Sequence, residues 1–255
     1  LALVEDRTAP LFVLVHAPLA YPNASFGNTY YDEARAGQLL DCFEGFSEVH
    51  VLSGHSHDNR NCQLTDAVID HNTGAVCACW WWSGVYTDRH ICKDGTPGGY
   101  GVYELEGKDL TWYYKGTGLD RDIQFRTYDM NKVWLDPATY LDDRTITVDG
   151  TPVAIRDWFS QQAYGKSFDR QRSDNCVYIN CWNWDPAWKI EVAEEGRGAL
   201  AVTRLWEYDP LHLITYTIPR LNKGSRPSFT ANKMGHLFSV QASSPVSTLR
   251  ITVTD

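Results

Sequence analysis

The N-terminal part of the chain alternates between continuous apolar runs and helical spacing. Residues 11–18 form an apolar run, Leu-Phe-Val-Leu-Val-His-Ala-Pro, that is typical of a strand buried on both faces. Residues 31–46 follow a helical period that places four large apolar side chains on one side: Leu39, Leu40, Phe43 and Phe46. A second apolar run at 49–53 ends at Gly54. The order strand, loop, helix, strand predicts a parallel α/β unit.

Beyond residue 60 the helical period disappears and short β-patterned runs take over. The first group of predicted strands covers 63–70, 75–86, 100–106 and 110–115. The second group covers 145–148, 177–182, 187–193, 200–208, 212–218, 237–242 and 247–254, with one short helix expected over 155–165. Short strands at regular spacing are typical of a β-sandwich. We therefore predict an α/β plus all-β chain, with an α/β domain over 1–124 and a C-terminal β-sandwich domain over 125–255.

The composition is that of a globular chain with an acidic balance. Of the 255 residues, 43% are hydrophobic and 22% are charged, which is enough for a sizeable core. The formal net charge of -9 would repel a polyanion, so we expect no duplex nucleic acid as a partner. No run approaches the ~20 consecutive apolar residues of a membrane-spanning helix, so we expect no membrane span.

The seven cysteines do not follow the CxxC spacing of a structural zinc site. Cys77 and Cys79 stand two apart in an expected strand and face the same way, which does not suit a mutual disulfide. We expect buried free thiols, and a bridge between Cys176 and Cys181 is left open as an alternative.

The most specific motif is Gly54-His55-Ser56-His57, directly after the second apolar run. From this composition, a G-H-x-H string is expected by chance roughly 0.02 times. In an extended segment, residues two apart face the same way with Cα atoms about 6.6 Å apart. That spacing is too wide for one ion but suits two ions about 3.5–4 Å apart, each bound by one imidazole, with Gly54 letting the backbone turn. The alternative is two histidines in an exposed loop.

His16 is the second candidate ligand. It lies in the first apolar run, at the carboxyl end of the predicted strand, where open α/β sheets place their ligand sites. A histidine there is ordinarily a hydrogen-bonded boundary residue, but together with His55 and His57 it becomes a candidate metal ligand. The remaining histidines carry no such signal. We expect His50 in the core and identify no partners for His71, His90, His212 and His236.

These motifs resemble the last two metal-binding motifs of the calcineurin-like metallophosphoesterases. The resemblance rests on His16 in Leu-Val-His-Ala-Pro and on Val-Leu-Ser-Gly-His-Ser-His at 51–57. It implies that His16 and His55 share one metal ion and that His57 binds its neighbour. It also implies two divalent ions (Mn, Fe or Zn) that activate water to hydrolyse a small-molecule phosphomonoester or phosphodiester. Asp58 is a candidate acceptor for the His57 ring, the alternative being an exposed loop carboxylate.

Two later segments, 94–103 and 112–116, look like the closing strands of the same catalytic fold. They resemble most the bacterial, exported subgroup that carries an extra C-terminal β-domain. The resemblance implies that residues 1–124 are the distal half of the metallophosphoesterase α/β-sandwich. It also implies that the protein is exported, to the periplasm or the cell surface.

The family's upstream motifs, D-x-H, G-D-x-x-D and G-N-H-[DE], have no counterpart before His16, which only fifteen residues precede. In the family these motifs supply the bridging Asp and the catalytic His, so we identify no catalytic residue here. We expect a fragment whose partner is the N-terminal half of the same protein, and which binds metal poorly and is inactive alone. The alternative function is a secreted, non-catalytic β-rich binding or interaction module with a relic metal site.

Overall fold

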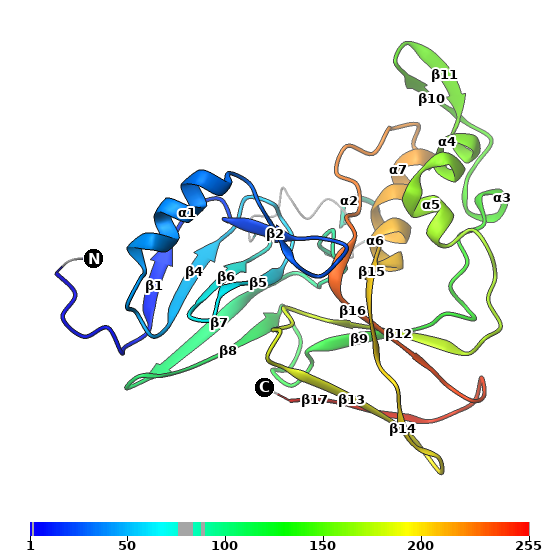
Figure 1. Cartoon of the computed structure of the whole chain (residues 1–255). Coiled ribbons are helices and arrows are strands. Elements are labelled where there is room, and N and C mark those ends of the chain that lie inside the picture. Colours follow the sequence, from blue (N-terminus) through cyan, green and yellow to red (C-terminus); the bar gives the residue numbers. More distant parts are fainter. Residues whose placement is uncertain (2, 76–83, 88–89, 255) are drawn as a thin grey trace. The chain divides into compact units, whose positions relative to one another are not determined.

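The computed structural model describes residues 1, 3–75, 84–87 and 90–254. Most of the strand predicted over 75–86, and the thiols of Cys77 and Cys79, lie outside these residues. The chain forms two compact units that interleave along the sequence (Figure 1). Unit 1 is made of Leu1–Trp80, Pro97–Gln124 and Trp182–Trp188, and unit 2 of Trp81–Thr96, Phe125–Cys181 and Lys189–Asp255.

The centre of unit 1 is a four-stranded sheet in the order β1–β4–β6–β5 (Figure 1). The strands β1 (Leu11–Leu14), β4 (Val49–Ser53) and β6 (Val68–Asn72) run parallel, and β5 (Arg60–Thr65) pairs antiparallel with β6. Helix α1 (Glu33–Cys42) connects β1 to β4 in the sequence, and these two strands lie side by side. The predicted parallel unit is therefore confirmed.

Helix α1 covers one face of this sheet. It begins after the N-cap Asp32, whose carboxylate accepts a hydrogen bond from the Arg35 amide. The apolar side predicted from the helical period packs against the valines of β4 and β6, in a cluster that contains Leu39, Leu40, Phe43, Phe46, Val49, Val51 and Val68. Because alternate residues of a strand face opposite sides, His50 and His71 lie on the other face.

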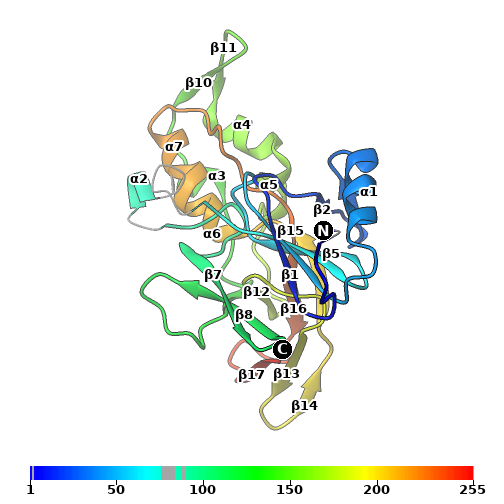
Figure 2. The same ribbon diagram turned by 90° about the vertical axis from the view of Figure 1, so that its left-hand side faces the viewer.

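Two hairpins complete unit 1. The strands β2 (Ala20–Pro22) and β3 (Asn28–Tyr30) form the first hairpin, between β1 and α1 in the sequence. The strands β7 (Gly99–Glu106) and β8 (Asp109–Gly116) form the second, on the opposite side of the sheet from α1 (Figure 2). The ring of Tyr103 in β7 contacts the ring of His71, so this hairpin closes the second face.

The strand β1 is shorter and less enclosed than its sequence predicts. It ends at Leu14, whose side chain is 77% exposed. Within the described part of the chain β1 pairs only with β4, so it is an edge strand of its sheet. The expectation of a strand buried on both faces is wrong here, because an apolar run indicates a strand without indicating which neighbours cover it.

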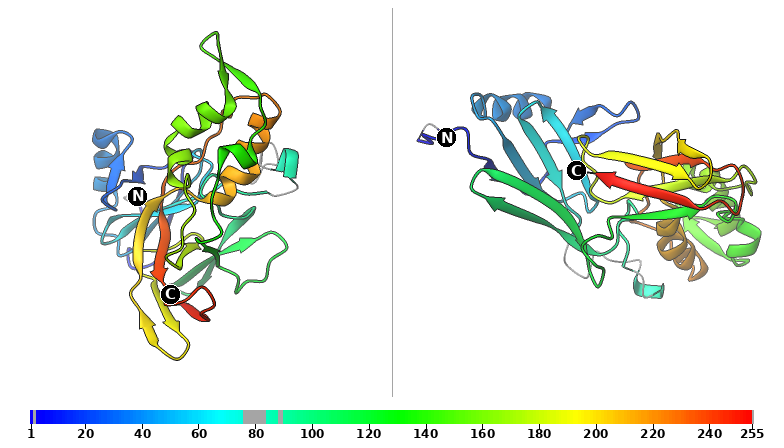
Figure 3. Two further views of the ribbon diagram at one scale, coloured as in Figure 1. Left: turned by 90° about the vertical axis from the view of Figure 1, so that its right-hand side faces the viewer. Right: turned by 90° about the horizontal axis from the view of Figure 1, so that it is seen from below.

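Unit 2 contains antiparallel sheets. The four-stranded sheet has the order β15 (Thr203–Glu207), β16 (Met234–Gln241), β12 (Cys176–Cys181) and β9 (Phe125–Asp129). The three-stranded sheet has the order β14 (Gly198–Leu200), β13 (Lys189–Glu194) and β17 (Leu249–Thr254) (Figure 3). A separate hairpin consists of β10 (Thr145–Val148) and β11 (Thr151–Ala154).

The helices of unit 2 are short, and several of them share one core with the four-stranded sheet. They are α2 (Gly84–Thr87), α3 (Pro137–Tyr140), α4 (Ile155–Gln161), α5 (Ala163–Ser167), α6 (Pro210–His212), the π-helix η2 (Leu213–Thr217) and α7 (Ile218–Asn222). Phe159, Leu213 and Leu221 from these helices pack with Met130 and Cys176. The helix expected over 155–165 is confirmed as α4 and α5. No helix of the described residues is long and apolar enough to cross a bilayer.

The strand predicted over 212–218 is wrong, because this segment is helical. Asp209 caps α6 by accepting hydrogen bonds from the Leu211 and His212 amides, and Pro210 occupies the first turn. The fully buried residues Leu213, Tyr216 and Leu221 then follow a spacing of three to five, which is helical rather than alternating. The β-branched residues in this run favoured the wrong element, and the cap at Asp209 was the better signal.

The alternative disulfide between Cys176 and Cys181 does not form. Both thiols are free and buried, and they stand at the two ends of the single strand β12. Five residues of extended chain separate their Cα atoms by about 16 Å, far beyond the reach of a disulfide. Burial raises the pKa of the Cys181 thiol to about 12, so it stays protonated and unreactive.

Candidate metal centre

His16 and His55 lie together just beyond the carboxyl ends of β1 and β4. The Nε2 atom of His16 is 3.0 Å from Nδ1 of His55, and the ring centroids are 4.8 Å apart. The parallel ladder continues past both strands, since the Val15 amide donates to the Leu52 carbonyl and the Gly54 amide donates to the His16 carbonyl. This pairing holds the two histidines at the same level of the sheet rim, and both rings are exposed.

The backbone of the Gly54–His57 motif is bent rather than extended. Its φ angle is +66° at His55 and +59° at His57, the left-handed region. The geometry expected for two same-facing residues of an extended segment therefore does not apply. Gly54 does not supply the turn either: a Cβ added there would meet the His16 and Thr73 carbonyl oxygens at an ordinary 3.8 Å. His55 and His57 carry the turn themselves, at about 1–3 kcal/mol of backbone strain each.

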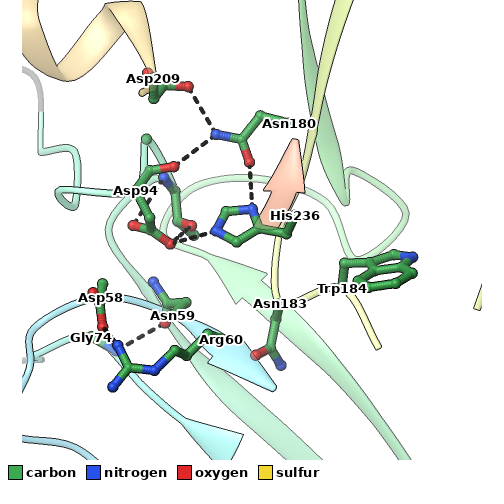
Figure 4. Close-up of polar contacts among 12 residues, drawn as sticks. Asp58, Asn59, Arg60, Gly74, Asp94, Asn180, Asn183, Trp184, Asp209 and His236 are labelled. Atoms are coloured by element: carbon green, nitrogen blue, oxygen red, sulfur yellow. Dashed lines mark hydrogen bonds and ion pairs between the residues drawn. The ribbon is translucent and has the colours of Figure 1, made fainter. Parts of the chain in front are cut away.

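A buried polar network holds this bent loop. The Asn72 amide nitrogen donates to Ser56 Oγ at 2.6 Å and to the Asp58 main-chain carbonyl at 2.7 Å. The Asp58 carboxylate accepts from Ser56 Oγ at 2.5 Å. It also pairs with Arg60 Nη1 at 2.5 Å, and Figure 4 shows these two residues. Asp58 is only 8% exposed, so the alternative of an exposed loop carboxylate is wrong. Its proposed hydrogen bond to His57 stays a prediction.

A second anchor, Asp70, fixes the segment that follows His16. Its Oδ2 atom accepts from the Leu19 amide and its Oδ1 atom from Ser53 Oγ, both at 2.6 Å. Asp70 is 1% exposed, and burial raises the pKa of its carboxyl above the usual value. This residue ties the end of β4 to the chain leaving β1, so the positions of His16 and His55 depend on it.

The facing nitrogens of His16 and His55 are at hydrogen-bond distance, slightly closer than two ligands of one ion. Two nitrogens bound to one ion at ~2.0–2.1 Å in tetrahedral geometry are about 3.4 Å apart, and the observed separation is 3.0 Å. Within residues 1, 3–75, 84–87 and 90–254, no group of three or more His, Cys, Asp or Glu side chains is placed to hold a metal ion. The structure brings His16 and His55 together; their role as ligands of one ion, and His57 as the ligand of a neighbouring ion, stay predictions.

A separate network of buried polar residues lies in unit 2, where no candidate site was predicted from the sequence. The Asn180 amide nitrogen donates to Asp209 Oδ2 and to the Asp94 carbonyl, both at 2.8 Å (Figure 4). Its Oδ1 atom lies 3.0 Å from His236 Nδ1, and His236 Nε2 lies 3.3 Å from Asp94 Oδ2. Because the Asn180 oxygen can only accept, Nδ1 of His236 carries a proton.

This network anchors a loop rather than forming a reactive site. Asp94, Asn180, Asp209 and His236 are at most 4% exposed, so a substrate does not reach them. Burial raises the pKa of the Asp209 carboxyl, which also accepts from Tyr128 Oη at 2.7 Å. The network joins the loop around Asp94 to β12, β16 and the start of α6.

The sequence contained weak signals for these residues. Asn180 interrupts an otherwise apolar predicted strand, and Asp209 precedes a proline, which is typical of a helix N-cap. His236 and Asp94 are far apart in the sequence and carried no local signal. Their partnership depends on the pairing of β12 with β16.

Comparison with known proteins gives one family. The family model described as the C terminal of calcineurin-like phosphoesterase matches residues 70–255, which is 186 of the 255 residues. The match begins within β6, so His16, His55 and His57 lie before the matched segment. No curated protein and no solved structure matches the chain. With most of its length covered, this chain belongs to the family of C-terminal regions of calcineurin-like phosphoesterases.

Proposed function

We propose that this chain is part of a dinuclear-metal phosphoesterase that hydrolyses a small phosphomonoester or phosphodiester with metal-activated water. Membership of the family supports the phosphoesterase class. The observation that carries the metal assignment is the 3.0 Å approach of His16 and His55. The pair lies at the carboxyl ends of neighbouring parallel strands, where α/β sheets place their ligands.

In this proposal His16 and His55 hold one divalent ion (Mn, Fe or Zn) and His57 holds its neighbour. Bound ions of this kind polarise a phosphoryl oxygen and lower the pKa of a water molecule that acts as the nucleophile. The chain's own residues position the ligands. Asp58 and its partners fix the loop of His55 and His57, and the exposure of the His16 and His55 rings leaves room for further ligands and for substrate.

We propose that the missing donors come from an N-terminal catalytic half of the same protein. The family is one of C-terminal regions, which supports such an arrangement. Residues 1–124 would then complete the α/β catalytic fold, and residues 125–255 would form a C-terminal β-sandwich. In this proposal the chain alone is inactive, and the protein is exported.

Metal analysis and hydrolysis assays of the full-length protein test the proposal. We expect about two equivalents of Mn, Fe or Zn and hydrolysis of p-nitrophenyl phosphate or its diester. His16→Ala and His55→Ala should each lower metal affinity or activity by at least about 10- to 100-fold. His90→Ala, which removes an exposed histidine of unit 2, is the matched control and should change neither.

The same experiment decides for or against the second function class. A full-length protein without stoichiometric metal, whose hydrolysis is indifferent to His16→Ala and His55→Ala, contradicts the enzyme. That result would favour the non-catalytic binding module with a relic metal site, because neither metal binding nor hydrolysis would then depend on His16 and His55.

A further inference from the structure

Two exposed tyrosines of unit 1 lie in contact at the hairpin of β2 and β3. The ring centroids of Tyr21 and Tyr31 are 4.9 Å apart, with an interplanar angle of 58°. Tyr21 is 38% exposed and Tyr31 is 58% exposed. A single aromatic side chain at the surface is ordinary, whereas two in contact, here called the tyrosine pair, offer a surface on which a flat ring stacks.

The hairpin that carries the tyrosine pair is tied to the sheet of unit 1. The Tyr31 amide donates to the Leu19 carbonyl at 3.1 Å, and the Leu19 amide donates to Asp70 Oδ2 at 2.6 Å. In β3, the Asn28 amide nitrogen donates to the Gln63 carbonyl of β5 at 2.6 Å. The two rings are therefore held in place before a ligand arrives, which lowers the entropic cost of binding.

A short series of contacts joins the tyrosine pair to the loop of the candidate metal centre. Tyr31 Oη lies 3.5 Å from Nη2 of Arg60, and Nη1 of the same guanidinium pairs with Asp58 at 2.5 Å. The Asp58 carboxylate also accepts from Ser56 Oγ, and Ser56 stands between the two histidines of the G-H-x-H motif. Arg60 and Asp58 are nearly buried and neutralise each other, so the tyrosine pair, and not these charges, faces the solvent.

The strand pairing places these contacts at the rim of the sheet that carries His16 and His55. Arg60 is paired with Asn72, the last residue of β6. Asn72 is in turn paired with Ser53, the last residue of β4, and His55 follows two residues later. The tyrosine pair and the candidate metal ligands therefore lie near the same end of this sheet.

The arrangement suits a substrate with two different ends. In the proposed function, on which this inference rests, the histidines of the metal centre hold the ion that binds the phosphoryl end. Because Asp58 and Arg60 stand between their loop and the tyrosine pair, a ring that reaches the pair is separated from the phosphorus by several bonds. A nucleoside monophosphate has this build, since its ribose separates the phosphate from the base.

We propose that Tyr21 and Tyr31 bind the base of a nucleoside phosphate by stacking, and so determine the substrate class of the phosphoesterase. Stacking accepts every base, because each base has a flat π-face. The tyrosine pair therefore selects for a ring at the right distance from the phosphate and discriminates little among bases.

Kinetics of the full-length protein with adenosine monophosphate, phenyl phosphate and glycerol phosphate test the proposal. Tyr21→Ala and Tyr31→Ala should each raise KM for adenosine monophosphate at least about 5-fold. They should leave metal content and KM for the other two substrates unchanged. Tyr31→Phe keeps the ring and should behave like the wild type, as should the matched control Tyr100→Ala, which removes a tyrosine that is 50% exposed on β7. An unchanged KM for adenosine monophosphate in both Tyr21→Ala and Tyr31→Ala, or an equal rise for all three substrates, would overturn the proposal.

Binding of adenosine to the chelator-treated full-length protein separates the tyrosine pair from the metal centre. Adenosine has the base but no phosphate, so its binding does not require a metal ion. With ¹³C-labelled tyrosine, we expect adenosine to shift the ring signals of Tyr21 and Tyr31, and Tyr21→Ala to weaken its binding at least about 5-fold. Adenosine that leaves both rings unshifted would overturn the proposal. Shifts of both rings in a protein that never holds metal would support the tyrosine pair and contradict the metal centre.

Discussion

Gly95 occupies a position in unit 2 where no side chain fits, and its replacement by alanine should be among the most destabilising single changes in the chain. Its φ angle is +78°, and a Cβ built there would lie 2.0 Å from Cγ of Asp209 and 2.2 Å from its Oδ2. The left-handed conformation alone costs alanine about 1–2 kcal/mol. The steric overlap is larger in effect, because Asp209 is fully buried and has to move.

Moving Asp209 breaks the hydrogen bonds that compensate its burial. The carboxylate accepts from Tyr128 Oη at 2.7 Å, from the Asn180 amide nitrogen at 2.8 Å and from the Leu211 amide at 2.8 Å. Removing the partners of a buried charged group typically costs about 3–5 kcal/mol. Together with the cost of the left-handed backbone, Gly95→Ala should lower the free energy of unfolding of unit 2 by about 4–7 kcal/mol, a large part of the usual total of about 5–15 kcal/mol.

Urea unfolding, combined with hydrogen exchange of the β12 and β16 amides, measures this loss for unit 2 specifically. Gly196→Ala is the matched control, since Gly196 has a φ of +75° with no atom within 4 Å of the added Cβ. It should cost only about 1–2 kcal/mol. If both variants lose the same stability, the packing of Gly95 against Asp209 contributes nothing and the reasoning is refuted.

Two further predictions concern buried ionisable groups. Burial lowers the pKa of His212 to about 3, so below pH 6.5 the unfolded chain binds a proton at this residue that the folded chain does not bind. The free energy of unfolding of unit 2 should therefore fall by about 1.4 kcal/mol for each pH unit below 6.5. His212→Gln should remove this pH dependence from the hydrogen exchange of the unit 2 amides. Asp58→Asn should destabilise unit 1 by about 3–5 kcal/mol, because it leaves Arg60 buried without its counter-charge; Asp6→Asn, in an exposed pair with Lys108, should leave Tm unchanged.

The elements that the sequence predicted best are those whose signal is local. The apolar runs at β1 and β4, and the helical period of α1, depend only on neighbouring residues, and the structure has all three. The failures arise where tertiary context decides. The run 212–218 has β-branched residues, but the cap at Asp209 and the packing of Leu213 make it helical.

At the candidate site too, one feature could be predicted from the sequence and another could not. The approach of His16 and His55 follows from one rule, that parallel neighbouring strands end at the same rim, and so two short motifs were sufficient to predict it. The bent backbone at His55 and His57 was not predictable, because it is imposed by Asn72 and Asp58 from outside the motif. A sequence motif identifies the candidate ligand residues, but it does not determine the backbone conformation of the loop on which they lie.

The buried histidines show why such networks escape a reading of the sequence. His50 stands between two valines in β4 and His71 between Asp70 and Asn72 in β6, and a buried polar residue is ordinarily satisfied by one partner. Here each ring has two partners, which come from β4, β5, β6 and Glu48 just before β4, and the Asn183 carbonyl orients the Asn61 amide. Every bond in such a chain constrains the next, so the orientation of each ring depends on partners that no local sequence pattern brings together.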